Sequence, residues 1–525
     1  MHHSRNLFSI LIFIHLSTLM VLANSSAIYF PSSEYDSNPV LESASRISPN
    51  NLAVLRGTTI YEKFVDDLIS QAVAKLTVEI NRLLISHAKG DENVLFSPIS
   101  ITGVLALVML GSNGETFKQI TQLWGLHVGI PDIDKKSQIV HEQLARMFYK
   151  LNQTTGFEVG DEVKVASALF IQDGYPIRPI YRFTAEDLYQ SSIVNVDFEA
   201  NPKEAQNLIN NWVSAKTNQK IKHILNDAPP SETRVIMASA LYFKAEWEQH
   251  FFEGLTKRRP FFVNGKNSKA TIEVDMMSNG GDFPYYKDHE LGCEVLGMPY
   301  KGNRSTMYVV MPFDSSIANL NQFEAKITVA DLNRLVNRTK LTGAVILFPK
   351  MKIDSTIDLK RTLQLLGVTS LFDPNQANLA LLSQGFIPQR ASYSTAIPIN
   401  VTSRYKTDQP AANLTEHIEV STLGSRIRVS ENIDNIRQQI NEQSTDNRYQ
   451  NPGLYASQVI HKVFMDITEK GTEAAAATSV SLTRVGSRVT FRVDVPFFFF
   501  IRHDETNTIL FWGSVVNPTP SYNII

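Results

Sequence analysis

Cysteine is almost missing from this chain of 525 residues, because Cys293 is the only one. An intrachain disulfide is therefore excluded. We expect stability to come from a packed core, in which Cys293 is a small buried hydrophobe. A charge excess is missing too, since 50 basic side chains balance 52 acidic ones and the formal net charge is −2. Such a balance gives no general attraction to nucleic acid or to an anionic membrane.

The motifs of common enzymes are also absent. The sequence contains no His-Glu-x-x-His helix, no Gly-x-Ser-x-Gly turn and no Gly-rich phosphate loop. Its 12 histidines are scattered, and no Cys–His cluster is available for zinc. We therefore expect no catalytic residue, no metal and no cofactor.

Long apolar runs are missing except at the amino terminus. There His2, His3 and Arg5 precede an apolar run over 7–22, and Ala23 ends a small-residue cleavage pattern. The pattern is typical of a secretory signal peptide over residues 1–23. An anchoring helix is the alternative, although the run is short and interrupted by polar residues. We expect a secreted protein without a membrane span.

Acceptor motifs for N-glycosylation are consistent with secretion. They lie at Asn152, Asn303, Asn337, Asn400 and Asn413. Each motif alone is a weak signal, and together they favour an extracellular glycoprotein.

The rest of the chain divides into a short extension and one large domain. Residues 24–60 are rich in Ser, Asn and Pro and are expected to form a flexible extension. Apolar residues recur at helical spacing from Phe64 to His87. Apolar runs of strand type follow at 239–247, 306–313, 344–353, 488–502 and 509–516. This mixture predicts an α+β fold with mostly antiparallel sheets over residues 61–525.

A polar insertion interrupts this domain at about 387–452. Hydrophobic periodicity mostly lapses there, and a short helix is expected near 431–442. A solvated surface excursion is the simplest interpretation. A cofactor site and a second recognition surface remain open.

The segment "EKGTEAAAATSVSLTRVGSRV" (469–489) can form a half-buried strand, because its alternate residues form two different faces. The small or apolar face comprises Thr472, Ala474, Ala476, Thr478, Val480 and Leu482. The polar or small face comprises Glu473, Ala475, Ala477, Ser479, Ser481 and Thr483. Gly471 is a plausible hinge. An exposed Ala-rich loop or helical turn is the alternative.

This segment resembles the hinge of the serpins, the serine protease inhibitor superfamily. Further motifs follow in family order: "NVLFSPISI" (93–101), "GSNGETFKQI" (111–120), "INNWVSAKTNQKI" (209–221), "SALYFKAEW" (239–247), "VDMMSNGGDFPYY" (274–286), "HKVFMDITEKGTEAAAAT" (461–478) and "VPFFFFIRHDETNTILFWGSVVNP" (495–518). The similarity covers about 65–385 and 453–525. The chain is identified as resembling a secreted, inhibitory serpin with a long insertion before the hinge strand.

The resemblance implies a fold of three β-sheets and about nine helices with an exposed reactive-centre loop. In inhibitory members a protease attacks this loop and forms an acyl-enzyme, and the loop then inserts into the central sheet. The partner would be an extracellular serine protease, and the inhibitor a monomer acting in a cascade such as innate immune or melanisation signalling. Non-inhibitory serpins, which act as carriers, storage proteins or chaperones, commonly have obstructive hinge residues. Here only Glu473 is charged, and it falls on the outward face.

The reactive centre has two candidate positions. Family spacing from Glu469 and from Pro496 places the cleaved bond at Val485–Gly486, which would suit an elastase-like protease. Arg484 is adjacent, and cleavage after it would suit a trypsin-like protease. Arg488 is a weaker third candidate.

The other site residues follow from the same resemblance. The hinge would comprise Glu469, Gly471, Thr472, Glu473, Ala474, Ala475, Ala476, Ala477 and Thr478. The shutter and breach, which control opening of the sheet, would comprise Ser97, Ser100, Ser239, His461, Trp247 and Lys350. Ser239 departs from the usual Asn and offers fewer hydrogen-bonding groups. We therefore expect a weaker or water-mediated link to His461 and a sheet that opens more easily.

Overall fold

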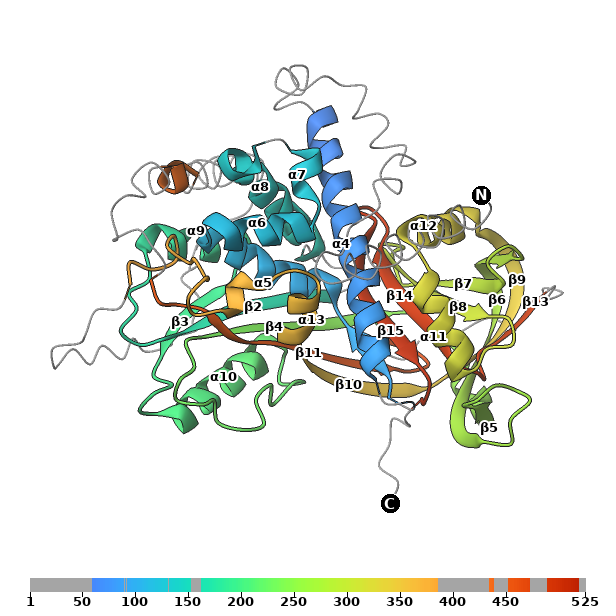
Figure 1. The fold of residues 1–525 in the computed structure, drawn as a ribbon. Helices are drawn as coiled ribbons and strands as arrows, with labels where there is room; N and C mark the ends of the chain where they lie inside the picture. Colours follow the sequence, from blue (N-terminus) through green and yellow to red (C-terminus); the bar gives the residue numbers. More distant parts are fainter. Residues whose placement is uncertain are drawn as a thin grey trace, which may run out of the picture. The chain divides into compact units, whose positions relative to one another are not determined.

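Helices and strands are mixed along the chain, as an α+β fold requires (Figure 1). The computed structural model describes residues 59–88, 90, 92–130, 132–152, 162–385, 434–438, 452–472 and 489–518. All of them belong to one compact unit, Gly57–Ile525. The apolar runs expected as strands at 239–247, 306–313 and 509–516 each form one strand. Those at 344–353 and 488–502 are each divided into two strands, Lys340–Pro349 with Met351–Asp358 and Val489–Arg492 with Phe497–His503. The helix expected from Phe64 begins earlier, at Thr59.

Six strands form one sheet, in the order β10-β11-β12-β4-β2-β3. Their bounds are Met351–Asp358 (β10), Ala456–Ile467 (β11), Gly471–Thr472 (β12), Val235–Glu246 (β4), Glu162–Gln172 (β2) and Ser192–Val196 (β3). Strands β11 and β4 run parallel and pair directly over 456–463 and 235–241. The two-residue strand β12 lies between them beyond this paired part.

The other strands form a nine-stranded sheet. Their bounds are Val94–Phe96 (β1), Thr508–Val515 (β15), Phe497–His503 (β14), Ser305–Pro312 (β8), Cys293–Pro299 (β7), Thr271–Asp288 (β6), Lys340–Pro349 (β9), Val489–Arg492 (β13) and Lys257–Phe262 (β5). The described strands thus form two hydrogen-bonded sheets rather than the three implied by the resemblance. The reason is the length of β6, which pairs with β5 and β9 along most of its course and with β7 at its end.

Helices cover both faces of the six-stranded sheet. The described helices are α4 (Thr59–His87), α5 (Pro98–Gly111), α6 (Gly114–Leu123), α7 (Leu126–Gly129), α8 (Ile133–Asn152), α9 (Pro179–Tyr189), α10 (Pro202–Lys216), α11 (Ile317–Lys326), α12 (Val329–Arg338) and α13 (Lys360–Leu365), with 3₁₀ turns at Glu253–Leu255 and Ser370–Phe372. Of these, α11 and α12 lie against β8 and β6 of the nine-stranded sheet. Figure 1 shows α5 on one face and α10 on the other. Ala205, Ile209 and Val213 of α10 pack on Ala238 and Ala240 of β4. None of the described helices is long and apolar enough to span a membrane.

Helix α5 is buried along its whole length, as expected for a helix that is apolar on all sides. Ser97 is its N-cap, since the Oγ accepts from Ser100 N at 3.3 Å. Pro98 follows at the first helical position, where a missing N–H costs nothing. The sequence at this start therefore fixes where α5 begins beneath the parallel strands.

Candidate functional site

The shutter residues lie together between α5 and the parallel strand pair. His461 of β11 and Ser239 of β4 are register partners, and both are fully buried. Ser239 Oγ lies 2.8 Å from His461 Nδ1, and Ser97 N donates to His461 Nε2 at 2.8 Å. Ser100 Oγ is 3.4 Å from the same Nδ1. One imidazole therefore links both strands to the start of α5.

The hydrogen bonds define the tautomer of His461. Since Ser97 N–H donates to Nε2, the ring proton is on Nδ1, and Nδ1 donates to Ser239 Oγ. Burial lowers the pKa of His461 from 6.5 to about 3, because a charged imidazole would lose its hydration. The ring is therefore neutral at physiological pH.

The link between Ser239 and His461 is direct, so of the two expected alternatives, a weaker link and a water-mediated one, the second is wrong. The physical reason is the register: the two residues are paired across adjacent parallel strands, so the short Ser side chain reaches the ring.

At the breach, where β12 enters the sheet, Glu469 forms a partly buried ion pair. Lys350 Nζ lies 2.9 Å from Glu469 Oε2, and Thr256 Oγ1 donates to Oε1 at 2.8 Å. Burial alone would raise the pKa of Glu469, but the hydrogen bonds from Lys350 and Thr256, with a backbone bond, lower it below its usual value. The carboxylate is thus charged and fixes the first residue of the expected hinge.

Trp247 forms hydrogen bonds with the backbone of the turn that joins β11 to β12. Its indole Nε1 donates to Thr468 O at 3.0 Å, and its backbone N donates to Lys470 O at 2.9 Å. The ring stacks on Tyr300 at a centroid distance of 4.5 Å. Tyr300 OH in turn lies 2.9 Å from Thr472 Oγ1, so the first hinge side chain to enter the sheet faces the protein interior.

Gly471 occupies a position that only glycine fits. Its φ is +153°, and an added Cβ would lie 2.1 Å from Ala245 O. The close approach exists because Gly471 and Thr472 pair with Glu246 and Ala245 of β4. The absence of a side chain thus allows the hinge to enter beside β4.

The hinge is antiparallel to both of its neighbours. Thr472 pairs with Ile467 of β11 on one side and with Ala245 of β4 on the other. The remaining expected site residues lie outside the described residues: Glu473, Ala474, Ala475, Ala476, Ala477, Thr478, Arg484, Val485 and Gly486. In the described residues, the two-residue strand β12 therefore lies between the parallel strands β11 and β4.

Two expected glycosylation sites are on the described surface. Asn303 is exposed in a turn with φ +52°, and Asn337 is exposed on α12. Asn152 ends α8, and Asn400 and Asn413 lie outside the described residues.

Cys293 is fully buried, as expected from its apolar neighbours. Burial, together with nearby Asp288, raises its thiol pKa to about 12, so the thiol stays protonated and unreactive.

Sequence reasoning missed three residues of the breach: Thr256, Tyr300 and Thr468. Thr468 directly precedes Glu469, so its position was available from the hinge motif. Tyr300 and Thr256 are 172 and 213 residues away from their partners, and no local pattern marks them.

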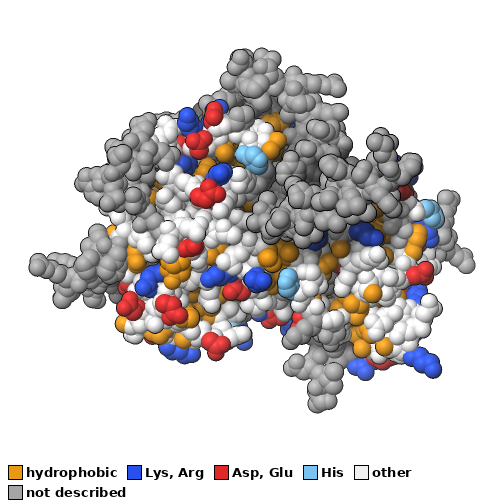
Figure 2. All heavy atoms as spheres, viewed as in Figure 1, with side chains coloured by type: hydrophobic (Ala, Val, Ile, Leu, Met, Phe, Trp, Pro, Cys, Tyr) orange, Lys and Arg blue, Asp and Glu red, His pale blue; other side chains and the backbone are white. Residues whose placement is uncertain are grey.

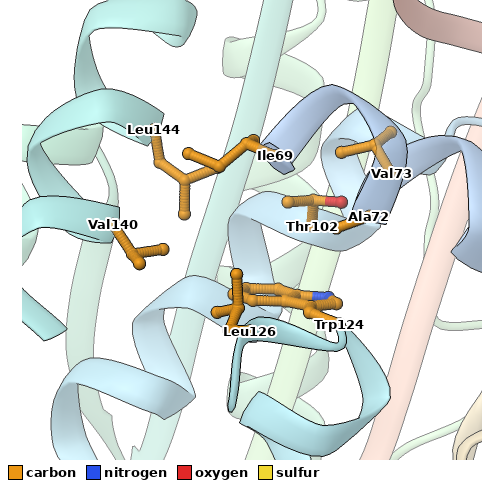
Figure 3. A pocket seen from close by; sticks show the side chains of 8 residues that line it. All are labelled: Ile69, Ala72, Val73, Thr102, Trp124, Leu126, Val140 and Leu144. Atoms are coloured by element: carbon orange, nitrogen blue, oxygen red, sulfur yellow. The ribbon is translucent and has the colours of Figure 1, made fainter. Parts of the chain in front are cut away.

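A small apolar pocket lies between α4, α5, the end of α6, α7 and α8 (Figure 3). It is lined by Ile69, Ala72, Val73, Thr102, Trp124, Leu126, Val140 and Leu144. The hydroxyl of Thr102 already donates to Pro98 O. The space is sufficient for about one water molecule, whereas small-molecule sites usually measure ~300 Å³ or more. This pocket therefore gives no support to a carrier role.

On the face drawn in Figure 2, basic and acidic side chains are interspersed over the described surface. Arg334 illustrates the pattern, since it lies within 4 Å of three carboxylates, those of Asp288, Glu290 and Asp331. Such mixed charge favours no polyanionic partner over this surface.

Together, the fold and this site identify the class of this protein as the serpins. The family model described as "Serpin (serine protease inhibitor)" matches residues 71–518, and the chain belongs to this family. The description of this family is that of protease inhibitors, although non-inhibitory serpins are among the similar structures. Serine protease inhibitor 28Dc of Drosophila melanogaster is 30% identical over 91% of this chain and 84% of its own length. Human Serpin B4 is 27% identical over 82% and 94%.

Solved structures show the same fold at lower identity. Human thyroxine-binding globulin matches with a TM-score of 0.66 and 23% identity over 87% of this chain and all of its own. Mouse protein-Z dependent protease inhibitor matches with a TM-score of 0.64 and 22% identity over 88% and all of its own. Because the first of these was solved in complex with thyroxine, the fold alone does not decide between protease inhibition and ligand binding.

Proposed function

We propose that this chain is a secreted inhibitor of serine proteases that traps its target by inserting its cleaved loop into the six-stranded sheet. One observation carries the proposal: Gly471 and Thr472 are already hydrogen-bonded between β11 and β4, antiparallel to both. Continued insertion would replace the direct parallel pairing of β11 and β4 by two antiparallel ladders. Antiparallel pairing is slightly more stable per residue, which favours insertion.

The register identifies what insertion must break. Each hinge residue beyond Thr472 would pair one position further back along β11 and β4. Thr478, six positions on, would therefore lie between His461 and Ser239. The hydrogen bond between these two side chains would have to open to admit it. Residues of the small or apolar face would point inward, like Thr472.

Incubation with a trypsin-like and an elastase-like protease tests this function. We expect a covalent complex that survives denaturant and a released carboxyl-terminal fragment. A fragment beginning at Val485 assigns specificity to Arg484, and one beginning at Gly486 assigns it to Val485. Arg484→Ala should abolish the complex with the trypsin-like enzyme, and Arg488→Ala serves as the matched control.

The alternative is a non-inhibitory serpin that acts as carrier, storage protein or chaperone. Proteolysis by every enzyme without a covalent complex would favour it. The extracellular role, in a cascade such as innate immune or melanisation signalling, depends on the signal peptide. A secreted form whose first residue is Asn24 would support it, and retention of residues 1–23 inside the cell would contradict it.

A further inference from the structure

Five residues of the polar insertion, 434–438, form a helical turn that packs against the body of the protein. This insertion turn is the short brown coil near α8 in Figure 1. Asn435 is exposed, but Arg437 is 1% exposed and Asp434 5%. The described part of the insertion therefore differs from the solvated excursion that its composition suggests. A buried ion pair is costly unless every polar group has a partner, so the partners decide what this contact is.

Arg437 closes the carboxyl end of α5. Its Nη2 donates to Met109 O at 3.2 Å and to Leu110 O at 3.4 Å, and its Nε donates to Ser112 O at 3.4 Å. The guanidinium also lies 4.4 Å from the ring centroid of Phe117 in α6. Unpaired carbonyls form the negative pole of a helix, so a cation is favoured there.

Asp434 closes the amino end of the regular part of α8. The backbone departs from helical geometry at Lys136, and the helix continues beyond it. Asp434 Oδ2 accepts from Gln138 N at 2.9 Å, and Oδ1 accepts from Ser137 Oγ at 2.6 Å. Arg437 Nη1 donates to both Asp434 Oδ1 and Ser137 Oγ. Each charge of the pair thus meets the helix pole of opposite sign.

Helix α5 is therefore held at both ends by polar contacts. At its start Ser97 and Ser100 contact His461 of the shutter, and at its end Met109 and Leu110 bind Arg437 of the insertion. All 14 residues of α5 are buried, and the helix is about 21 Å long. Any movement of α5 that accompanies opening of the shutter must also move the groups that bind Arg437.

We propose that the α5–α8 junction is a docking site for the insertion turn. Through α5, this docking restrains the separation of β11 and β4 that opens the six-stranded sheet. The regulatory half rests on the proposed function, because it concerns the sheet that would receive the loop. The docking half of the proposal does not rest on the proposed function, and a separate experiment tests it.

The docking half is tested by a double-mutant cycle in the full chain. Arg437→Ala and Ser137→Ala remove the two sides of one contact, and Asn435→Ala is the control on the exposed face of the turn. We expect both single variants to lower the unfolding midpoint and to speed hydrogen exchange at Gln138 N, less than additively in combination. Ser137→Ala is the milder change and keeps the test usable if Arg437→Ala does not fold. Unchanged exchange at Gln138 in both variants would overturn the docking site.

The regulatory half is tested by adding a synthetic peptide of residues 472–485 and following the gain in heat resistance as it enters the sheet. We expect Arg437→Ala and Ser137→Ala to take up the peptide about two- to thirtyfold faster than the parent and Asn435→Ala. Altered exchange at Gln138 with an unaltered uptake rate would overturn the restraint. If the parent takes up no peptide and forms no covalent complex, the proposed function and the restraint are both wrong. Hydrogen exchange at Gln138 N still tests the docking site in that case.

Discussion

At the scale of single residues, the proposed opening of the six-stranded sheet would depend on a few buried polar side chains. His461 uses both ring nitrogens, one toward α5 and one toward β4. A buried hydrogen bond of this kind contributes about 0.5–1.5 kcal/mol. The contact is therefore strong enough to hold the strands and weak enough to break when the loop enters.

Ser239→Asn should strengthen this contact. The Asn amide has two N–H donors and an acceptor oxygen, whereas the Ser hydroxyl has one donor and an acceptor oxygen, so Asn can make one more hydrogen bond beside His461. We expect the free energy of unfolding to rise by about 1 kcal/mol, measured by denaturant unfolding of the uncleaved protein. Ser355→Asn on β10, away from His461, is the control. No rise for Ser239→Asn would reject the idea of an easily opened shutter.

Acidic pH should reduce the stability that the buried His461 contributes to the folded protein. The folded protein protonates His461 only near pH 3, whereas the unfolded chain does so near 6.5, so the unfolded state binds more protons between these values. Stability contributed by His461 is present above pH 6.5 and falls by up to about 1.4 kcal/mol per pH unit as pH drops toward 3.

The measurement is a difference in unfolding free energy between the parent and His461→Asn at several pH values. The comparison is needed because burial also lowers the pKa of His141 to about 3 and of His503 to about 4, and raises that of Glu324 to about 7. Equal pH slopes in parent and variant would contradict the assignment to His461.

Gly471→Ala should destabilise the entry of the hinge. The new Cβ would meet Ala245 O, and the backbone angle is strained for any other residue, which costs about 1–3 kcal/mol. Gly254→Ala is the matched control, because a Cβ there meets nothing within 4 Å. The unfolding midpoints of the two variants should differ by about 1–3 °C, and equal midpoints would contradict the position of β12.

At the scale of elements, the alternation of the hinge decides whether it can become a strand. Inserted as a strand, the six residues from Thr472 to Ala477 would place every second side chain inward. Ala476→Arg would bury a charge under the sheet, whereas Ala477→Arg would point to solvent. We expect the first variant to be cleaved as a substrate with little covalent complex and the second to remain an inhibitor. The ratio of complex to cleaved protein measures this, and equal ratios would contradict the assignment of the two faces.

The elements near the loop were predictable from the sequence, because their residues carry strong local patterns. His461, Glu469, Gly471 and Trp247 all lie within recognisable motifs, and the structure places them at the shutter and the breach. The partners brought by packing, such as Tyr300, carry no such pattern.

The insertion turn was harder to predict for a different reason. Asp434 and Arg437 are charged residues in a polar segment, so composition assigns them to solvent. Their burial depends on the ends of α5 and α8, which only the folded structure brings together. Helix dipoles and buried backbone groups, rather than apolar side chains, stabilise this contact.

At the scale of the whole molecule, the account requires that the uncleaved fold is held short of its most stable arrangement. The parallel pair β11–β4 remains closed below β12, while a segment of suitable alternation follows Thr472 in the sequence. Cutting that segment would free it to enter between β11 and β4 and to pair antiparallel with both. The fold itself would otherwise be retained.

The most direct measurement compares unfolding midpoints before and after one cut in the loop near Arg484 or Val485. The account predicts that the cleaved protein resists heat better by at least several degrees, because the inserted strand adds a full set of hydrogen bonds and buried side chains. A cleaved protein with an unchanged or lower midpoint would contradict loop insertion, and with it the proposed trapping of proteases.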